Sequence, residues 1–372
     1  MAPALDVCIR GSGIVGRTLA LLLARERLRV GLVEQPPAPA SGHSDVRAYA
    51  LNPASRALLE MLRAWPDAAH ATPVAAMQVR GDEGGAVSFN AAEQGVPALA
   101  WIVDVPALQH RLGEALRYQP LVEHLQAPKP ASLTVVCEGR ASATRAEFGV
   151  QFEVTAYPQR AIAARLSCEQ AHGLIARQWF ANGEIMALLP MGGSEIGAAG
   201  NLVALVWSVR EERADALLAL EPAAFALEVE SACGRALGAM SLSTERAAWP
   251  LQLARASRWC GPGWALAGDA AHNLHPLAGQ GLNLGLADAK ALADVLRERE
   301  YWRAVDDPKL LRRYERSRKA DVLAMGATTD GLQQLFAQPG GPWPLVRNWG
   351  MRGFERSGPV KHWVARQAMG RL

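Results

Sequence analysis

The feature that most constrains this chain is a glycine-rich turn near its start, Gly11-Ser12-Gly13-Ile14-Val15-Gly16. A short apolar segment at 6–10 precedes the turn, and a leucine-rich segment with helical spacing follows it up to Arg25. A second apolar segment, Val30–Val33, comes next. This order predicts a strand-helix-strand unit whose glycines allow a tight turn and a close approach of a pyrophosphate. The backbone N–H groups and the helix dipole would face the phosphates.

An acidic residue ends the second predicted strand, where the ribose of a bound nucleotide would lie. Glu34 comes roughly twenty residues after Gly11, the usual spacing for this role. A carboxylate there accepts hydrogen bonds from both ribose hydroxyls and disfavours a 2′-phosphate. The bound nucleotide is therefore predicted to be FAD or NAD rather than NADP.

A second glycine-rich run, Gly268–Gly285, follows a short apolar segment that ends at Ala267. A carboxylate at a strand end can accept hydrogen bonds from a polyol such as ribityl. Proline and glycine let the backbone pass close to a flat ring, and N–H groups that open a helix stabilise negative charge on it. These roles suit a flavin better than a nicotinamide. The predicted cofactor contacts in this run are Asp269, Pro276, Gly279, Gly281, Leu282 and Asn283.

Composition excludes several other classes of protein. A chain of 372 residues with half of them hydrophobic has room for two or more domains. A net charge of +3 is too small for a protein that binds duplex nucleic acid, unless the charge is clustered. The five cysteines have no metal-ligand spacing, so we expect reduced structural thiols, no metal and a cytoplasmic protein. The longest uncharged run, 331–346, contains three prolines and cannot span a bilayer.

The pattern of elements predicts an α/β protein whose domains are discontinuous. Residues 51–64 have helical spacing, Asp104 is placed to cap a helix at 106–118, and residues 133–136 read as a buried strand. The predicted organisation has a doubly wound, Rossmann-like FAD domain, a second β-sheet substrate domain and a helical C-terminal region. The FAD domain is predicted to comprise 1–75, 98–147 and 255–300, and the substrate domain 76–97 and 148–254. The helical C-terminal region is predicted at 301–372.

Several motifs together resemble the class A flavoprotein monooxygenases, the p-hydroxybenzoate hydroxylase type. More narrowly, the chain is similar to the ubiquinone-biosynthesis hydroxylases of the UbiH and UbiF type. The similarity rests on segments that cover nearly the whole chain in order: Asp45–Leu51, Ala187–Pro190, Gly268–Asp288, Arg313–Arg316, Thr329–Leu332, Leu335-Phe336, Arg347-Asn348 and Ala368–Gly370.

The resemblance implies a set of roles and a reaction. Gly11, Gly13, Gly16 and Glu34 would hold the adenosine diphosphate, Arg47 and Gln109 would touch the FAD, Asp269 would bind the ribityl chain, and Pro276 and Gly279–Asn283 would lie along the flavin. NAD(P)H would reduce FAD, and one oxygen atom of O₂ would pass to an electron-rich, prenylated phenol. Because such a ring is itself nucleophilic, no residue is assigned a catalytic role.

One departure from the family pattern keeps alternatives open. The family has Asp-Gly in its middle motif, whereas this chain has Glu138-Gly139. The chain is also somewhat short for the family. A monooxygenase that acts on a soluble aromatic compound, and a flavin-binding accessory subunit without hydroxylase activity, therefore remain alternatives.

Two histidines in the second glycine-rich run could suggest catalysis or metal binding. His272 and His275 lack neighbouring ligands at metal spacing, so the sequence favours turn histidines that bond to the backbone.

The segment 345–372 combines several arginines with two tryptophans. A basic amphipathic surface of this kind can sit on anionic lipid or dock a partner. The hypothesis that follows is peripheral association with the inner membrane face or with a quinone-biosynthesis complex.

Overall fold

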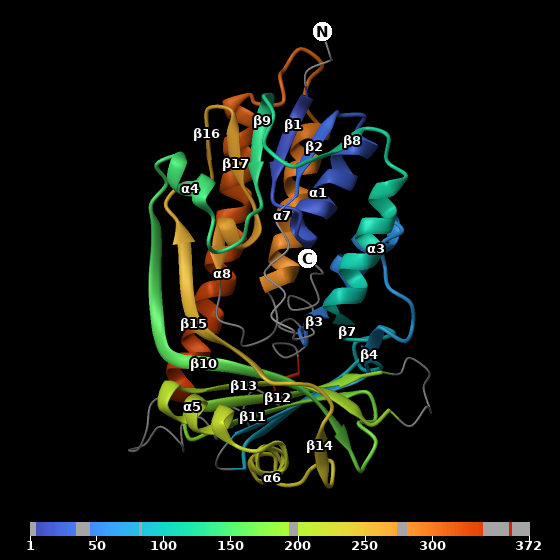
Figure 1. Ribbon diagram of the computed structural model, residues 1–372, viewed down its shortest axis with the longest axis vertical. Helices are drawn as coiled ribbons and strands as arrows, with labels where there is room; N and C mark the ends of the chain where they lie inside the picture. The colour runs from blue at the N-terminus through green and yellow to red at the C-terminus, as the bar shows by residue number, and fades with distance from the viewer. Residues whose placement is uncertain are drawn as a thin grey trace.

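The computed structural model describes residues 5–34, 45–81, 84–192, 200–273, 281–337 and 357–358, and of 324–337 it describes the backbone alone. Within these ranges the chain forms three sheets and the helices that pack on them (Figure 1). The predicted α/β class, with a doubly wound sheet and a second sheet domain, is confirmed.

The first sheet is built from the predicted strand-helix-strand unit. Its strands are β1 (Leu5–Arg10), β2 (Val30–Val33), β8 (Val122–Leu125), β9 (Ala131–Val136), β16 (Cys260–Gly261) and β17 (Trp264–Leu266). They lie in the order β16-β17-β9-β1-β2-β8, and all neighbours are parallel except β16 and β17. The sheet continues from β1 to β2 on one side and from β9 to β17 on the other side. Ligands of doubly wound sheets bind at the strand ends where the order reverses in this way.

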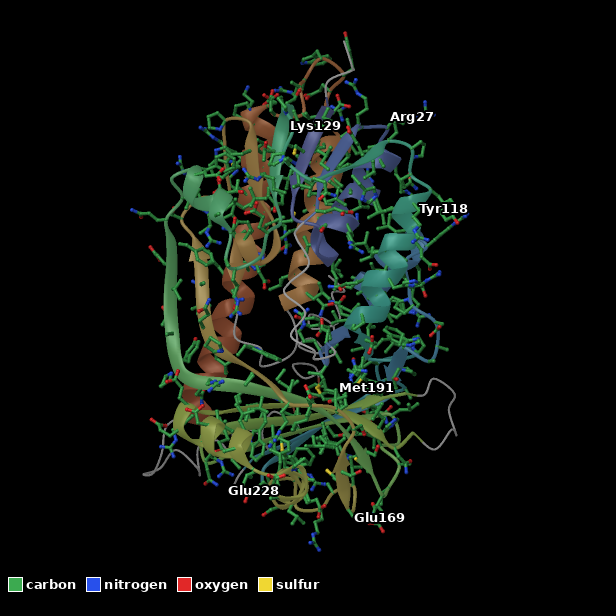
Figure 2. All side chains as sticks on the ribbon, viewed as in Figure 1. Arg27, Tyr118, Lys129, Glu169, Met191 and Glu228 are labelled. Atoms are coloured by element: carbon green, nitrogen blue, oxygen red, sulfur yellow. The ribbon has the colours of Figure 1, made fainter. Side chains whose placement is uncertain are left out.

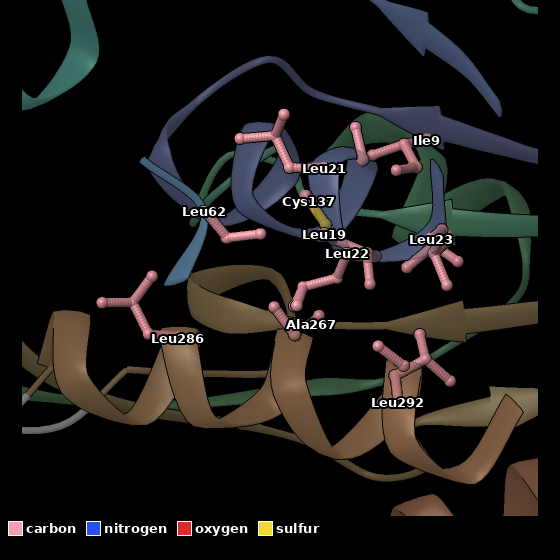
Figure 3. Packing of buried hydrophobic residues seen from close by; sticks show 14 of the residues in the cluster. Ile9, Leu19, Leu21, Leu22, Leu23, Leu62, Cys137, Ala267, Leu286 and Leu292 are labelled. Atoms are coloured by element: carbon pink, nitrogen blue, oxygen red, sulfur yellow. The ribbon is translucent and has the colours of Figure 1, made fainter. Parts of the chain in front are cut away.

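Leucine-rich helices bury this sheet. The main ones are α1 (Ile14–Arg25), α3 (Val105–Arg117) and α7 (Gly281–Arg297). Leu19 and Leu22 of α1 meet Ala267 and the leucines of α7 in one apolar core (Figure 3). Burying a leucine contributes roughly 1.5–3 kcal/mol, so these side chains hold the glycine-rich turn in place.

The second sheet is larger and mainly antiparallel. Its strands are β5 (Ala76–Gly81), β6 (Ala86–Asn90), β10 (Phe152–Cys168), β11 (Ile175–Ala181), β12 (Glu184–Met191), β13 (Leu202–Arg210), β14 (Met240–Leu242), β15 (Ala247–Ala256) and β18 (His272–Asn273). Their order is β18-β15-β10-β13-β12-β11-β5-β6, and β14 pairs with β10.

The two faces of this sheet pack against different partners. Helices α5 (Glu211–Ala219) and α6 (Pro222–Ala232) cover one face, where large side chains such as Trp207 and Phe225 are buried. The other face looks toward the rest of the molecule. In Figure 2, Met191 lies on that inner side and Glu228 on the helix-covered side.

A three-stranded sheet lies between the other two sheets (Figure 1). It consists of β3 (Ala48–Leu51), β4 (Ala71–Val74) and β7 (Ala100–Asp104) in the order β3-β7-β4. The side chain of Asp104 accepts a hydrogen bond from the Ala107 N–H at 3.0 Å, so the predicted cap of α3 is confirmed. Further elements are α2 (Pro53–Met61), α4 (Ala143–Glu147), η1 (Gly268–Ala270) and α8 (Pro308–Ala337).

The structure differs from the sequence-based expectations at two element boundaries. The predicted helix 51–64 begins at Pro53, because Leu51 pairs in β3 and the Asn52 side chain caps the helix by accepting from the Ser55 N–H at 2.9 Å. The predicted domain boundary at residue 254 falls inside β15, which pairs with β10 as far as Ala256.

The remaining expectations concern the cysteines, the membrane and the chain end. All five cysteines are buried and free. In the ranges that the structure describes, no helix is long and apolar enough to cross a membrane. The basic segment 345–372 lies outside the described residues, apart from 357–358.

Candidate functional site: a nucleotide cleft joined to an apolar cavity

The three glycines of the N-terminal turn are required for different reasons. Gly11 has a φ of +113°, and a Cβ atom there would lie 2.5 Å from the carbonyl oxygen of Cys137. A Cβ atom on Gly16 would lie 1.9 Å from the carbonyl oxygen of Gly11. A Cβ atom on Gly13, by contrast, would have no protein atom within 4 Å. Gly11 and Gly16 therefore serve the protein's own packing, while Gly13 faces an open cleft.

This cleft begins where α1 starts and runs between the first sheet and β15. Its walls bring together the motifs that the sequence analysis singled out, although they are far apart in the chain. The lining residues include Gly13, Ile14, Val15, Arg47, Tyr49, Gln109, Glu138, Gly139, Arg140, Trp249, Gln252, Gly268, Asp269, Gly281 and Leu282. The cleft thus lies at the carboxyl ends of β1 and β9, as expected for a doubly wound sheet.

The structure places the other predicted site residues elsewhere. Gly11 and Gly16 lie inside the turn, and Glu34 lies in a neighbouring hollow. Pro276 and Gly279 lie outside the described residues. The side chain of Asn283 bonds to residues of β3 and α2.

The hollow around Glu34 adjoins the glycine-rich turn. Its lining includes Ser12, Arg17 and His124, and Oε1 of Glu34 lies 2.9 Å from Nδ1 of His124. The Arg17 guanidinium donates to the carbonyl oxygens of Ser12 at 2.7 Å and Gln109 at 2.8 Å. Arg17 thereby joins the turn to α3, a role that the sequence pattern did not indicate.

Arg47 is held at the cleft by a bidentate ion pair. Its guanidinium donates to the Asp45 carboxylate at 2.8 and 2.6 Å. The pair with Asp45 raises the pKa of Arg47, so the guanidinium stays charged. From the second sheet, Arg165 reaches Oδ2 of Asp104 at 2.5 Å and the carbonyl oxygen of Val46 at 3.5 Å. Arg165 therefore ties the Arg47 segment to the second sheet, which sequence reasoning missed.

Two groups in the cleft walls have raised pKa values. Burial raises the pKa of Tyr49, so its phenol remains protonated at neutral pH and can donate a hydrogen bond. Burial between the cleft walls also raises the pKa of Asp269, although solvent in the cleft reaches its side chain. That carboxylate therefore faces the space in which a polyol chain would lie.

Glu138, the departure from the family pattern, has a well-satisfied carboxylate. It accepts from the hydroxyls of Ser142 at 2.7 Å and Thr144 at 2.6 Å, and it pairs with Arg10 at 3.3 Å. Burial raises its pKa, but these hydrogen bonds and Arg10 outweigh burial and hold the pKa below its ordinary range. The longer side chain is thus used to bind the start of α4, and the backbone of Gly139 still lines the cleft.

The buried carboxylate of Asp288 holds the Gly268–Asp269 turn in place. Oδ2 of Asp288 accepts from the Gly268 N–H at 2.9 Å and lies 2.6 Å from Nε2 of His272. Its other oxygen accepts from Nε of Arg318 in α8 at 2.8 Å. The side chains of Asp288, His272 and Arg318 are all buried.

The role predicted for His272 is therefore wrong, because its ring bonds to a carboxylate rather than to the backbone. Its partner, Asp288, lies on α7, sixteen residues further along the chain, so no local pattern could reveal it. His275 lies outside the described residues. In the part of the chain that the structure describes, no three His, Cys, Asp or Glu side chains are grouped to hold a metal ion.

Asn283 joins the start of α7 to the third sheet. Its Oδ1 accepts from the Asn52 N–H at 3.0 Å and from the Ser55 hydroxyl at 2.7 Å, and its Nδ2 donates to the Ala50 carbonyl at 2.8 Å. The side chain thus holds the two elements together.

A second, apolar cavity opens beside the cleft, between the second and third sheets. Arg47, Tyr49 and Trp249 line both spaces. The remaining lining is mostly aliphatic and includes Val74, Met77, Ile102, Ala163, Ala176, Ile185, Ala187, Leu189, Ala204 and Val206. A cofactor ring in the cleft would therefore border an apolar space.

These features define a class of protein. A glycine-rich turn, an acidic residue at the end of β2 and a carboxylate at the far wall fit a dinucleotide with a polyol chain. The family model for the FAD binding domain matches residues 129–328. The chain is therefore a FAD-binding oxidoreductase.

Comparison with known proteins narrows the class. The chain is 32% identical to "Ubiquinone hydroxylase UbiL" of Rhodospirillum rubrum, over 99% of this chain and 90% of that protein. It is also 32% identical to the 3-demethoxyubiquinol 3-hydroxylase of Escherichia coli, over 98% of both chains. The structure of Klebsiella pneumoniae HpxO with FAD and uric acid has a TM-score of 0.75 at 16% identity, over 98% of this chain and 96% of that one. The chain belongs to the FAD-dependent monooxygenase family that includes these ubiquinone hydroxylases.

Proposed function

We propose that this protein hydroxylates the ring of a prenylated phenol in ubiquinone biosynthesis, with NAD(P)H as electron donor and O₂ as oxygen source. The observation that carries the proposal is the apolar cavity that opens from the FAD cleft beside Arg47, Tyr49 and Trp249. The polar members of the lining are Arg47, Tyr49, Arg177, Gln178, Ser208 and Trp249, and the rest is hydrocarbon, which offers a charged aromatic acid few partners in exchange for its lost hydration. A prenylated ring gains from burial of its hydrocarbon. The two hydroxylases that are 32% identical to the chain support the same reaction class.

Different residues around the cleft would bind different parts of the cofactor. The N–H groups at the start of α1 and the helix dipole would hold the pyrophosphate, Glu34 the adenosine ribose and Asp269 the ribityl chain. When bound, FAD supplies the redox chemistry that links the nicotinamide to O₂. Ile14, Val15 and Leu282 would give the bound cofactor apolar walls that exclude water.

The substrate end of the cleft can orient a phenol. Tyr49 is protonated at neutral pH and can donate to the phenol oxygen, and the positive charge of Arg47 lowers the energy of a developing phenolate. An electron-rich ring needs no covalent catalyst, so orientation and exclusion of water are the tasks left to the protein.

The first test is the absorbance spectrum of the purified protein under anaerobic conditions, before and after NADPH or NADH. Flavin bands that bleach, followed in air by a hydroxylated product from a prenylated phenol, are the expected result. Product from unprenylated soluble aromatics alone would favour the alternative substrate class. A flavin that no nicotinamide reduces, with or without a phenol, would favour the accessory-subunit alternative.

We also propose that the basic segment 345–372 brings the protein to an anionic membrane surface or to a partner complex. A substrate with a prenyl tail is poorly soluble in water, so a peripheral location would shorten its path to the cavity. Cosedimentation with vesicles that contain anionic lipid is expected, and the combined changes Arg352→Glu, Arg356→Glu and Arg366→Glu should reduce it severalfold. Equal sedimentation of variant and parent would count against the membrane.

A further inference from the structure

The sheet side of the apolar cavity includes four alanines, one from each of four neighbouring strands. Ala163, Ala204, Ala187 and Ala176 come from the neighbouring strands β10, β13, β12 and β11 and line the cavity. We refer to these four residues as the alanine floor.

The opposite face of the same strands shows that small residues are not a property of the whole sheet. There Ile162, Leu188 and Leu205 are fully buried against α5 and α6. Side chains alternate between the two faces of a strand, so these large residues face the helices. The inner face carries the four alanines among larger residues such as Ile185, Leu189 and Val206. The alanines leave room on this face that leucine or isoleucine at the same positions would fill.

The floor runs across the strands and away from the cleft. Trp249, at the junction with the cleft, is on β15, and the next strands in order are β10, β13, β12, β11 and β5. Neighbouring strands lie about 4.8 Å apart, so the distance from β15 to β11 is roughly 19 Å. That length suits a phenol ring followed by about three isoprene units when the ring lies at the β15 end.

The polarity of the lining gives the cavity a direction. Arg47 and Tyr49 lie at the junction with the cleft, where a phenol oxygen needs a partner. Beyond them the lining is mostly aliphatic, and Ala176 packs in one apolar cluster with Ile102 of the third sheet. The polar exceptions are Arg177, Gln178 and Ser208. The Arg177 guanidinium donates to the carbonyl oxygens of His172 at 2.9 Å and Ile175 at 3.3 Å, so its charge is bound by the protein itself. A bound molecule with one polar ring and one hydrocarbon tail would therefore place its tail over the alanine floor.

We propose that the alanine floor binds the first isoprene units of the substrate tail and sets the length of tail that the enzyme accepts. The proposal rests on the proposed function, because it assumes a phenol ring at the Arg47, Tyr49 and Trp249 end. Ala163, one strand from Trp249, borders the ring. Ala176, four strands from Trp249, borders only the tail. The two alanines therefore provide a matched pair for the test.

The experiment compares Ala176→Leu with Ala163→Leu, using one phenol without a tail and the same phenol with one and with three isoprene units. In the parent enzyme, KM is expected to fall as the tail lengthens. Ala176→Leu should raise KM for the three-unit substrate at least tenfold and leave KM for the untailed phenol within about twofold. Ala163→Leu should raise KM for all three substrates.

Three results would overturn the proposal. Ala176→Leu could raise KM equally for tailed and untailed phenols, which would place the ring over β11. It could leave all three KM values unchanged, which would place the tail outside the cavity. In the third, KM in the parent enzyme would be independent of tail length.

A second variant covers the case in which Ala176→Leu does not fold. Met77 lies at the far end of the lining, on β5, which is next to β11. Met77→Ala lengthens the cavity there, and we expect it to lower KM for the three-unit substrate relative to the one-unit substrate. An unchanged ratio of these two KM values would contradict the proposal.

Binding separates failure of this inference from failure of the proposed function. The change in the flavin absorbance on addition of each phenol reports its dissociation constant without turnover. If the parent protein binds the tailed phenol more tightly and Ala176→Leu abolishes the preference, the floor binds the tail even where no phenol is hydroxylated. If hydroxylation proceeds but the dissociation constant does not depend on tail length, the proposal for the alanine floor is wrong and the proposed function stands.

Discussion

Asp288→Ala is expected to destabilise the protein by about 3–5 kcal/mol, the usual cost of removing one partner from a buried ion pair. The carboxylate accepts from the Gly268 N–H and from Arg318 and lies 2.6 Å from Nε2 of His272. Its loss would leave the buried Arg318 guanidinium with only the exposed carboxylate of Asp321 as an ionic partner, and the Gly268 N–H without its acceptor. Because Gly268 precedes Asp269, we also expect weaker FAD binding. Urea unfolding and titration with FAD measure the two effects.

A matched control lies on the same helix. Asp294 pairs with Lys290 at 2.6 Å and Arg297 at 3.0 Å, and its side chain is 29% exposed. Partly exposed pairs of this kind contribute roughly 0–1 kcal/mol, so Asp294→Ala should change the unfolding free energy little. If Asp288→Ala and Asp294→Ala unfold at the same urea concentration, the buried network does not stabilise the cleft.

The same carboxylate predicts a dependence of stability on pH. Burial raises the pKa of Asp288, but His272 and Arg318 outweigh burial and hold the pKa below its ordinary value. A carboxyl with a lowered pKa in the folded state adds stability above its unfolded value of about 3.9 and loses it as the pH falls through the folded value. The difference in stability between parent and Asp288→Ala should therefore shrink on acidification below about pH 4.

Gly13→Ala is expected to weaken FAD binding at least tenfold while leaving the apoprotein folded. A Cβ atom at this position meets no protein atom within 4 Å, and Gly13 has a φ of −71°, which alanine adopts freely. The cost to the apoprotein is about 1 kcal/mol or less, the difference between glycine and alanine as a helix N-cap. The added methyl group would instead occupy the space in which a pyrophosphate approaches the backbone.

Gly16→Ala provides the contrast. Its Cβ atom would lie 1.9 Å from the carbonyl oxygen of Gly11, so the turn must shift, and we expect a loss of stability of about 1–3 kcal/mol or more together with the loss of FAD. Thermal unfolding of the apoproteins and FAD titrations distinguish the two variants. Unchanged FAD affinity in Gly13→Ala would show that the pyrophosphate lies elsewhere.

Features that depend on local geometry can be predicted from the residues alone. The strand, glycine-rich turn and helix at the start of the chain follow from residue spacing and from backbone conformations that only glycine tolerates, as at Gly11. The Asp104 cap is equally local, since the side chain and the N–H that it binds lie three residues apart. The resemblance to FAD monooxygenases rests on such short motifs, and the family match bears it out.

Contacts between side chains that are distant in the chain follow from the folded arrangement of the elements. Asp288 joins His272 to Arg318, and Arg165 crosses from the second sheet to Asp104. The amide side chain of Asn283 bonds to Ala50 and Ser55, more than two hundred residues away in the chain. Side-chain pairs across tens of residues leave no periodic pattern, because their spacing along the chain is set by the connections between elements.

The apolar cavity is also a product of packing. The alanines that line it show no pattern along each strand, and they share one face only once the sheet has formed. There Ala163 and Ala187 lie on either side of Val206, and Ala204 lies beside Leu189. A cavity depends on what two sheets fail to fill between them, and that volume is defined by the tertiary structure alone. The local sequence therefore determined the cofactor that the chain binds, while sheet packing determined the shape of the space beside it.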